Sequence, residues 1–376
     1  MNTRFTRFPL TVLVGLIAAT GMGAGISGAE GIGVLTASYT LDNGWGNAAA
    51  YDVAFDNAGH VVAVGSLLAS ENEQNAAELV KLTTAGDLVW RETIEEGLRD
   101  PTLAGTQNPG KHSSVDQFFG VAVNSADEIV VVGRISGVWS GNVLGSYHWS
   151  AAVQKYGPNG ALLWEDRYHD GTMSAWQEYD GIRITADDSI YVTGAAMGDW
   201  GVNQYRWLSM RYDTNGGVNL GPLHHNHATS FDLKDTASDL AVDAEGNIIV
   251  VGRIGIGGTA PAQNWDWHVR KLDSSGALLW EDTIDANQLD DAARSVDIMP
   301  DGNIVVAGYG NGGTDNGDNG IYFWRIVRYS PIGERLSTWN YGPSLTGGNH
   351  RCNDVLAAPD GTLYVAGFFT DSGGVQ

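Results

Sequence analysis

The chain has 376 residues, and its 44 acidic against 21 basic side chains give a formal net charge of −23. So acidic a surface repels nucleic acid and anionic lipid, which excludes nucleic acid as a partner. The single cysteine, Cys352, excludes an intramolecular disulfide, so the fold must rest on its core.

Residues 1–29 have the layout of a secretory signal peptide. Arg4 and Arg7 precede the apolar run PLTVLVGLIAATGMGAG, and a small-residue cleavage site, SGA, ends at Ala29. We expect cleavage after Ala29 and export to the periplasm, the cell surface or the medium. Pro9 and several glycines interrupt the apolar run, so we expect no membrane span in the mature chain.

One apolar phrase rich in β-branched residues recurs six times after this segment. Each copy ends in glycine, as in NIIVVG at 247–252, and the glycines lie 56 to 68 residues apart. They are Gly65, Gly133, Gly194, Gly252, Gly308 and Gly367. A fixed period of this length is typical of repeat architectures.

Each repeat contains four expected strands. In ASDLAVDAEGNIIVVG at 237–252, an alternating strand leads through a tight turn closed by Gly246 into a continuously apolar second strand. A third strand follows a longer loop, as in WHVRKL at 267–272, and a fourth follows directly, as in ALLWEDTI at 277–284. Four antiparallel strands make one blade of a β-propeller. We therefore expect an all-β propeller of about six four-stranded blades over residues 30–376, the last blade composite or incomplete.

The six apolar phrases are predicted to be equivalent second strands, each buried on both faces. They span 60–64, 128–132, 189–193, 247–251, 303–307 and 362–366. The glycine after each strand is expected to let the chain leave where a side chain would be crowded. The sequence ends after two strands of the sixth repeat. Either residues 34–41 pair into that blade and close the ring, or the chain is a fragment of a longer one.

The repeats resemble those of secreted bacterial propeller proteins with delta-60 and SBBP-type repeats. The resemblance rests on D-x-x-G-x-I-x-V-x-G at 243–252 and on W-x-V-x-K-L-D-x-x-G at 267–276, and it covers about residues 35 to 376. Two repeats depart from it, because Asp127 and Asp188 stand where the turn glycine is expected. The resemblance implies the propeller fold, whereas members of this family share no single activity.

Histidines gather in the segments that join one repeat to the next, where we expect the variable loops and any binding site. His169, His225 and His227 are the candidate metal ligands, because imidazole binds transition metals and several loops converge at the mouth of the channel. No ligand spacing such as HExxH accompanies these histidines, and solvated loop histidines are the alternative interpretation.

The acidic loop DNGDNG at 315–320 is a second candidate metal site. The oxygens of Asp315 and Asp318 suit a divalent metal such as calcium. Ile326 stands at the twelfth position, where a calcium loop carries glutamate, so we favour a glycine-rich loop without metal.

Tryptophans fall into two groups by position. Three lie in variable loops and are the candidate ligand-binding residues, either stacking on a ligand or filling their own loops: Trp139, Trp176 and Trp200. Trp267 instead has counterparts at the same place in two other repeats, Trp207 and Trp324, so we expect it to pack between blades.

Two classes of function remain open. We favour an exported, non-catalytic propeller whose variable loop face binds a glycan or a protein, because no repeat carries a recognisable nucleophile or acid–base pair, and we assign no catalytic residue. The alternative is a propeller enzyme, either a hydrolase, a lyase or a quinone-dependent dehydrogenase, with a metal site at the channel mouth.

Overall fold

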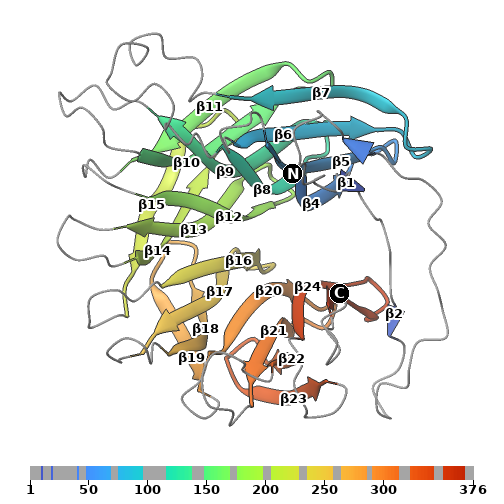
Figure 1. Ribbon diagram of the computed structural model, residues 1–376. Coiled ribbons are helices and arrows are strands. Elements are labelled where there is room, and N and C mark those ends of the chain that lie inside the picture. Colours follow the sequence, from blue (N-terminus) through green and yellow to red (C-terminus); the bar gives the residue numbers. More distant parts are fainter. Residues whose placement is uncertain are drawn as a thin grey trace, which may run out of the picture. The chain divides into compact units, whose positions relative to one another are not determined.

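A computed structural model describes the chain as an all-β protein (Figure 1). The described residues are 10–11, 18–19, 40–41, 48–68, 75–95, 116–137, 148–169, 176–197, 205–227, 235–256, 264–285, 290–312, 322–342 and 350–368. Among these residues there is no helix long and apolar enough to span a membrane.

Two compact units divide the chain. The first comprises Met1–Val14, Leu35–Gly201 and Arg211–Asn219, and the second comprises Gly15–Val34, Val202–Met210 and Leu220–Gln376. Five sheets have four consecutive antiparallel strands each, in sequence order, which is the blade of a β-propeller. The expected fold class is therefore confirmed.

The first unit holds two complete sheets and the first half of a third. The first sheet consists of β4 (Ala48–Phe55), β5 (Val61–Leu68), β6 (Asn75–Leu82) and β7 (Leu88–Ile94). The second consists of β8 (Gln117–Val123), β9 (Ile129–Gly137), β10 (His148–Tyr156) and β11 (Leu162–Tyr168). The third consists of β12 (Gln177–Ile184), β13 (Ile190–Met197), β14 (Tyr205–Tyr212) and β15 (Val218–His225), and residues of β14 and β15 contribute to both units.

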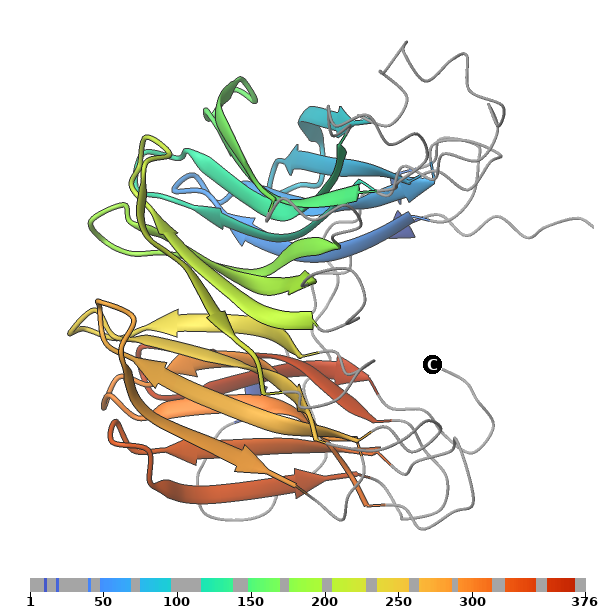
Figure 2. The same cartoon turned by 90° about the vertical axis from the view of Figure 1, so that its left-hand side faces the viewer.

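The second unit holds the fourth, fifth and sixth sheets, which Figure 2 shows in yellow to red, stacked face to face. The fourth sheet consists of β16 (Thr236–Val242), β17 (Ile248–Gly255), β18 (Trp265–Leu272) and β19 (Leu278–Ile284). The fifth consists of β20 (Ala292–Ile298), β21 (Ile304–Asn311), β22 (Tyr322–Tyr329) and β23 (Arg335–Tyr341). The sixth contains β24 (Arg351–Ala357) and β25 (Leu363–Phe368).

The six apolar phrases are confirmed as second strands, since they form β5, β9, β13, β17, β21 and β25. Their expected burial on both faces is wrong for β25, whose residues are half-buried or exposed. The role expected for their glycines is wrong, because the strands continue beyond them. Gly252 lies inside β17, opposite a bulge in β16 between Ala237 and Asp239. A Cβ atom added to Gly252 would lie 2.1 Å from the carbonyl oxygen of Thr236. The glycine therefore permits the close approach of the bulged first strand, not the end of the second.

The turns between first and second strands also keep their backbone form where the sequence departs from glycine. Gly59 and Gly246 have φ angles of 80° and 79°. Asp127 and Asp188, at the equivalent turn positions, have φ angles of 60° and 59°. Aspartate tolerates this left-handed conformation better than most residues, so the turn survives the substitution.

The expectation for residues 34–41 is wrong in its described part. Thr40–Leu41 forms β3 and pairs with β1 (Leu10–Thr11) in a two-stranded sheet of its own. The strand beside β25 is instead β2 (Ala18–Ala19), which lies in the segment expected to be cleaved. Short apolar segments carry too little pattern to specify which sheet edge they join.

Tryptophans at repeated positions pack between neighbouring sheets, as expected. Trp267 is fully buried, in a core that also contains Val251 of its own sheet and Val296 and Val327 of the fifth sheet. On the fourth strands, Trp280 donates from Nε1 to the carbonyl oxygen of Pro331 in the fifth sheet at 3.1 Å. These contacts hold adjacent sheets face to face.

Candidate functional site

The structure describes half of the residues that the sequence marks as site candidates. Trp139, Trp200, Asp315 and Asp318 lie outside the described residues. The described candidates are Trp176, His169, His225 and His227.

One expected position is corrected by the structure. His225 does not lie in a loop, because it is the last residue of β15. His227 follows two residues later and is exposed, and its backbone N–H donates to Asp235 at 2.7 Å. His169 follows β11, and it belongs to neither of the two donor clusters formed by the described residues.

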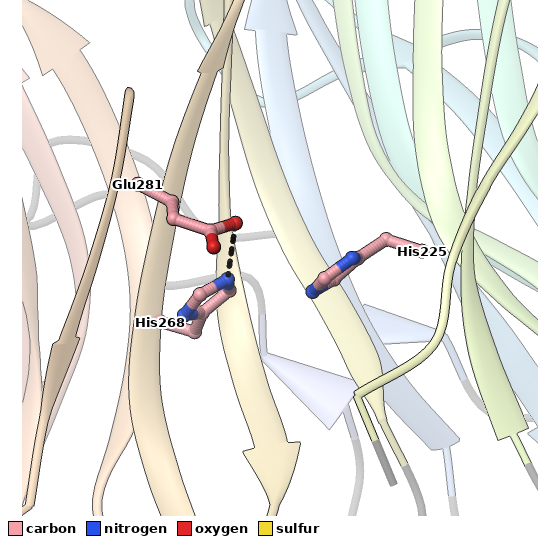
Figure 3. A group of neighbouring side chains, drawn as sticks. All are labelled: His225, His268 and Glu281. Atoms are coloured by element: carbon pink, nitrogen blue, oxygen red, sulfur yellow. Dashed lines mark ion pairs between the residues drawn. The ribbon is translucent and has the colours of Figure 1, made fainter. Parts of the chain in front are cut away.

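His225 meets two residues that sequence patterns do not single out, His268 of β18 and Glu281 of β19 (Figure 3). One potential ligand atom from each of the three lies within 4.8 Å of the others. All three residues belong to the second unit. His268 and Glu281 share one face of the β18–β19 hairpin, since His268 pairs with Thr283 and Arg270 pairs with Glu281.

Burial leaves two imidazole nitrogens of this cluster without a partner. His268 is 1% exposed, and its Nδ1 lies 2.9 Å from Thr283 Oγ1. Its Nε2 points toward Glu281 Oε2 at 3.8 Å, beyond hydrogen-bond distance (Figure 3). Among the described residues, Nε2 of His268 and Nε2 of His225 are both buried and accept or donate no hydrogen bond. Unsatisfied buried polar atoms are costly and need an explanation.

Both imidazoles are held in one orientation. The rings of His225 and His268 are stacked, with centroids 5.2 Å apart and planes 10° from parallel. Trp207 of β14 packs edge-on against both rings, at 5.5 Å and 5.3 Å, and its own Nε1 donates to Arg253 O at 3.0 Å. Aromatic packing fixes side-chain rotamers, so the two nitrogens are presented without freedom to turn away.

The electrostatic surroundings keep both rings neutral. Burial lowers the pKa of His268 to about 3, with further contributions from His225, Arg270 and His227. Burial lowers the pKa of His225 to about 4, with Arg270 and His227 adding to the shift. A neutral imidazole has a lone pair on one nitrogen, which is the form that binds a metal ion.

A second cluster of donors is acidic. Asp266, Asp285 and Asp291 bring carboxylate oxygens within 4.8 Å of one another. Asp291 already pairs with Arg325 Nη1 at 3.1 Å and accepts from Asn311 N at 3.2 Å. Burial, followed by the charges of Asp285 and Asp291, raises the pKa of Asp266 to about 7.

Asp291 directly precedes β20, the first strand of the fifth sheet, and two other sheets carry an aspartate at the same position. Asp116 accepts from Ser136 N at 2.6 Å, and Asp235 accepts from Gly255 N at 2.7 Å, as Asp291 does from Asn311 N. Each carboxylate satisfies a backbone N–H near the end of the second strand of its own sheet. Asp291 is therefore explained by the repeat itself.

Aromatic and cationic side chains form a continuous strip in the first unit, which we call the aromatic strip. Its members, in spatial order, are Tyr51, Phe119, Arg134, Trp149 and Trp176. Tyr51 and Phe119 meet edge to face at 5.2 Å, and the Arg134 guanidinium lies 5.4 Å from the Phe119 ring centre and 4.5 Å from that of Trp149. Trp149 and Trp176 follow, with ring centroids 4.8 Å apart.

Trp176 is the member of the strip that the repeat does not explain. Trp149 has a counterpart in Trp265, which lies beneath Arg253 at 5.0 Å in the same manner. Trp176 has no aromatic counterpart, because the equivalent residues before the other first strands include Val115, Lys234 and Asp290. It is 41% exposed, whereas the repeated tryptophan Trp267 is fully buried.

Comparison with known proteins identifies no relative by sequence. No protein-family model matches the chain, and no curated protein has a significantly similar sequence.

Solved propeller structures resemble the chain only distantly. The periplasmic gluconolactonase of Pseudomonas aeruginosa is 13% identical with a TM-score of 0.45, over 84% of this chain and 72% of that one. The β-propeller domain of the Trilobed protease from Pyrococcus furiosus is 10% identical with a TM-score of 0.43, over 86% and 81%. A polysaccharide lyase of the ulvan lyase family PL25 is 12% identical with a TM-score of 0.49, over 84% and 75%. Similarity at this level carries no information about what this chain binds or transforms.

Proposed function

We propose that this chain is an exported, non-catalytic β-propeller that binds a neutral oligosaccharide through the aromatic strip. The observation that carries the proposal is the exposed indole of Trp176, which packs against Trp149 at the end of the strands where the longer loops begin. The same proposal assigns the chain to the secreted propeller proteins with delta-60 and SBBP-type repeats, on the repeat motifs given above.

The chemistry of the strip suits a sugar ring. The C–H groups on one face of a pyranose pack on an indole face, while its hydroxyl groups pair with neighbouring polar side chains. Such side chains are present, because Arg134 binds Glu178 Oε2 at 2.9 Å and also contacts Gln117. A net charge of −23 disfavours polyanionic saccharides, so the ligand we infer is neutral.

The test compares two exposed aromatic residues of the first unit. Trp176→Ala removes the exposed indole of the strip. Phe55→Ala is the control, because it removes a ring that is 55% exposed, lies at the last residue of β4 and does not belong to the strip. Binding to an array of neutral and acidic glycans, followed by calorimetry with the best oligosaccharide, should show at least a tenfold weaker affinity for Trp176→Ala only. Equal affinities, or no bound glycan at all, would remove the proposal, and capture of a protein partner that depends on Trp176 would replace it.

Export is the second part of the proposal. Processing after Ala29 leaves Glu30 as the first residue of the mature protein, and its net charge becomes more negative because Arg4 and Arg7 are removed. N-terminal sequencing of protein recovered outside the cytoplasm tests this directly. An intact Met1 on the exported protein would contradict it.

A metal-dependent enzyme is the second candidate function, and one observation favours it. His225, His268 and Glu281 supply three protein donors, the number found in catalytic zinc sites that keep a position open for water or substrate. Turnover of a hydrolase, lyase or dehydrogenase substrate that disappears on metal removal would favour this function over simple binding.

A further inference from the structure

We propose that His225, His268 and Glu281 bind one divalent transition-metal ion of the zinc class within the second unit. The inference goes beyond glycan binding and does not depend on it, because the two sites share no residue. It rests on the three donors, on their partners and on the chemistry of the set.

The donor atoms are already close, and the two imidazole nitrogens make no hydrogen bond to the described residues. Nε2 of His225 and Nε2 of His268 are buried without hydrogen-bond partners among the described residues, and a carboxylate oxygen of Glu281 lies within 4.8 Å of both histidines' ligand atoms. A tetrahedral zinc ion holds its donors roughly 3.3 Å apart, given bond lengths of about 2.0–2.1 Å. The donor atoms must therefore move closer by at most about 1.5 Å, and the Glu281 side chain, which is 44% exposed, has room to move.

The residues around the donors match the outer shell of a metal site. Nδ1 of His268 lies 2.9 Å from Thr283 Oγ1, and with Nδ1–H as the donor this contact holds the tautomer whose Nε2 carries a lone pair. Arg270 Nε donates to Glu281 Oε2 at 3.2 Å and orients the carboxylate, which has a second oxygen to offer. Trp207 covers both imidazoles. Each donor is thus positioned by a neighbour that is not itself a ligand.

The donor set selects the class of ion. Two imidazole nitrogens and one carboxylate oxygen suit Zn²⁺ and its transition-metal neighbours, whereas Ca²⁺ requires six to eight oxygen ligands. The fourth position is taken by water or by His227, whose ring lies 6.5 Å from that of His225 and 6.4 Å from that of His268. Bound metal would join β15 to the β18–β19 hairpin.

Metal titration of the full chain tests the proposal. Protein stripped with a chelator is titrated with Zn²⁺ by calorimetry and with Co²⁺ by visible absorption, and its metal content is measured after dialysis. We expect one ion per chain, a cobalt spectrum typical of tetrahedral coordination, a higher melting temperature with Zn²⁺, and no competition from a large excess of Ca²⁺.

Variants of the ligands give the specific readout. Glu281→Gln keeps the size of the side chain and an acceptor for Arg270. We expect it to weaken Zn²⁺ binding at least about 100-fold, which is a larger loss than the removal of an outer-shell partner causes. His268→Ala should also abolish binding, and the scaffold tolerates alanine there because Ala152 occupies the same position opposite the strand glycine in the second sheet. His60→Gln, in the first unit, is the matched histidine control and should leave affinity within about twofold.

A variant of His227 shows whether this residue or water is the fourth ligand. A tenfold or greater loss of Zn²⁺ affinity in His227→Gln identifies it as the fourth ligand, and an unchanged affinity identifies water. The proposal is overturned if the wild-type chain binds no stoichiometric Zn²⁺ or Co²⁺, or if Glu281→Gln and His225→Ala bind both ions as tightly as the parent.

Discussion

The first and fourth sheets place different chemistry on the same scaffold positions. Opposite the strand glycine, the first sheet carries Glu78 and the fourth carries His268. On the adjacent fourth strand, Arg91 of the first sheet is replaced by Glu281, while threonine is kept opposite, as Thr93 and Thr283.

These different residues leave different hydrogen-bonding states in the two sheets. Glu78, Arg91 and Thr93 of the first sheet satisfy one another, and we call them the closed group, whereas His268 of the fourth sheet retains a nitrogen that is unpaired within the described part of the chain. Glu78 accepts two hydrogen bonds from Arg91 at 2.8 Å each and one from Thr93 at 2.7 Å. His268 keeps the hydrogen bond to Thr283, and its second nitrogen has no hydrogen-bond partner among the described residues. A buried position that is satisfied within its own hairpin serves stability, and one that is not satisfied is available to a ligand.

The largest expected effect concerns the core beside this position. The residue before His268 is Trp267, whereas the residue before Glu78 is Ala77. Trp267→Ala should cost about 3–5 kcal/mol of unfolding free energy, because the neighbours of a fully buried indole cannot refill its volume. Chemical denaturation measures this, and a cost below about 1 kcal/mol would mean that the fourth sheet tolerates the small residue of the first.

Exchanging the two patterns should abolish the proposed metal site. Arg270 stands where the first sheet has Val80, opposite Arg91. His268→Glu combined with Arg270→Val and Glu281→Arg therefore gives the fourth sheet the residues of the first, and we expect Zn²⁺ affinity to fall by more than about 100-fold. The same variant should fold, since the new pair can form the bidentate contact seen between Arg91 and Glu78. Metal binding that survives the exchange would show that the ion does not need this hairpin.

Breaking the closed group should destabilise the first sheet. Glu78→Ala leaves Arg91 and Thr93 without their shared acceptor, at an expected cost of about 2 kcal/mol, reduced from the value for fully buried pairs because Arg91 is 33% exposed. Glu281→Ala in metal-free protein should cost less than about 0.5 kcal/mol. If both substitutions cost the same in urea unfolding, the proposed difference between the two sheets does not exist.

The retained threonine should have a different role in each sheet. Thr283→Val removes the hydroxyl that pairs with Nδ1 of His268 and orients the ring, and it should weaken Zn²⁺ binding by about 10–100-fold without removing a ligand. Thr93→Val should change only stability, by about 1 kcal/mol. A shift of the cobalt spectrum in Thr283→Val distinguishes a positioning role from a general loss of structure.

The smallest effect concerns a feature that both sheets share. Burial acts to raise the pKa of Asp56, but hydrogen bonds from Lys81 and His60 outweigh it and hold that pKa below the usual range. Hydrogen bonds from Lys271 and Asn247 likewise outweigh burial and lower the pKa of Asp243 in the fourth sheet.

A lowered pKa in the folded state stabilises the protein above the ordinary aspartate pKa of about 3.9, and this contribution is lost as the pH falls below that value. Asp56→Asn should therefore flatten the acid limb of the stability curve, by about 1 kcal/mol between pH 5 and pH 3. An unchanged acid limb would show that the ion pair with Lys81, at 2.8 Å, contributes nothing.

Local sequence patterns determined the repeat and most of its strands. Alternation in the first strand, continuous apolar residues in the second and a turn residue between them are all readable within about sixteen residues, because they depend on the chain's own backbone and on burial. Asp127 and Asp188 are instructive, since the sequence marked them as departures and the structure keeps the same left-handed turn. The repeated tryptophans were likewise identified as packing residues from their spacing alone.

Only the tertiary structure shows why the second strands contain a glycine and which residues surround His225. Gly252 has its role because a bulge in another strand brings Thr236 O against it, which no local pattern reveals. His268 and Glu281 looked like ordinary strand residues, and only the β18–β19 register and the packing of β15 bring them to His225, 43 residues before His268 in the sequence. A comparison of repeat positions could have signalled His268, because it stands opposite a glycine where other sheets carry Glu78, Ala152 or Arg325. The sequence pattern reports which face of a strand is buried, whereas the partners on that face are set by the neighbouring strands and sheets.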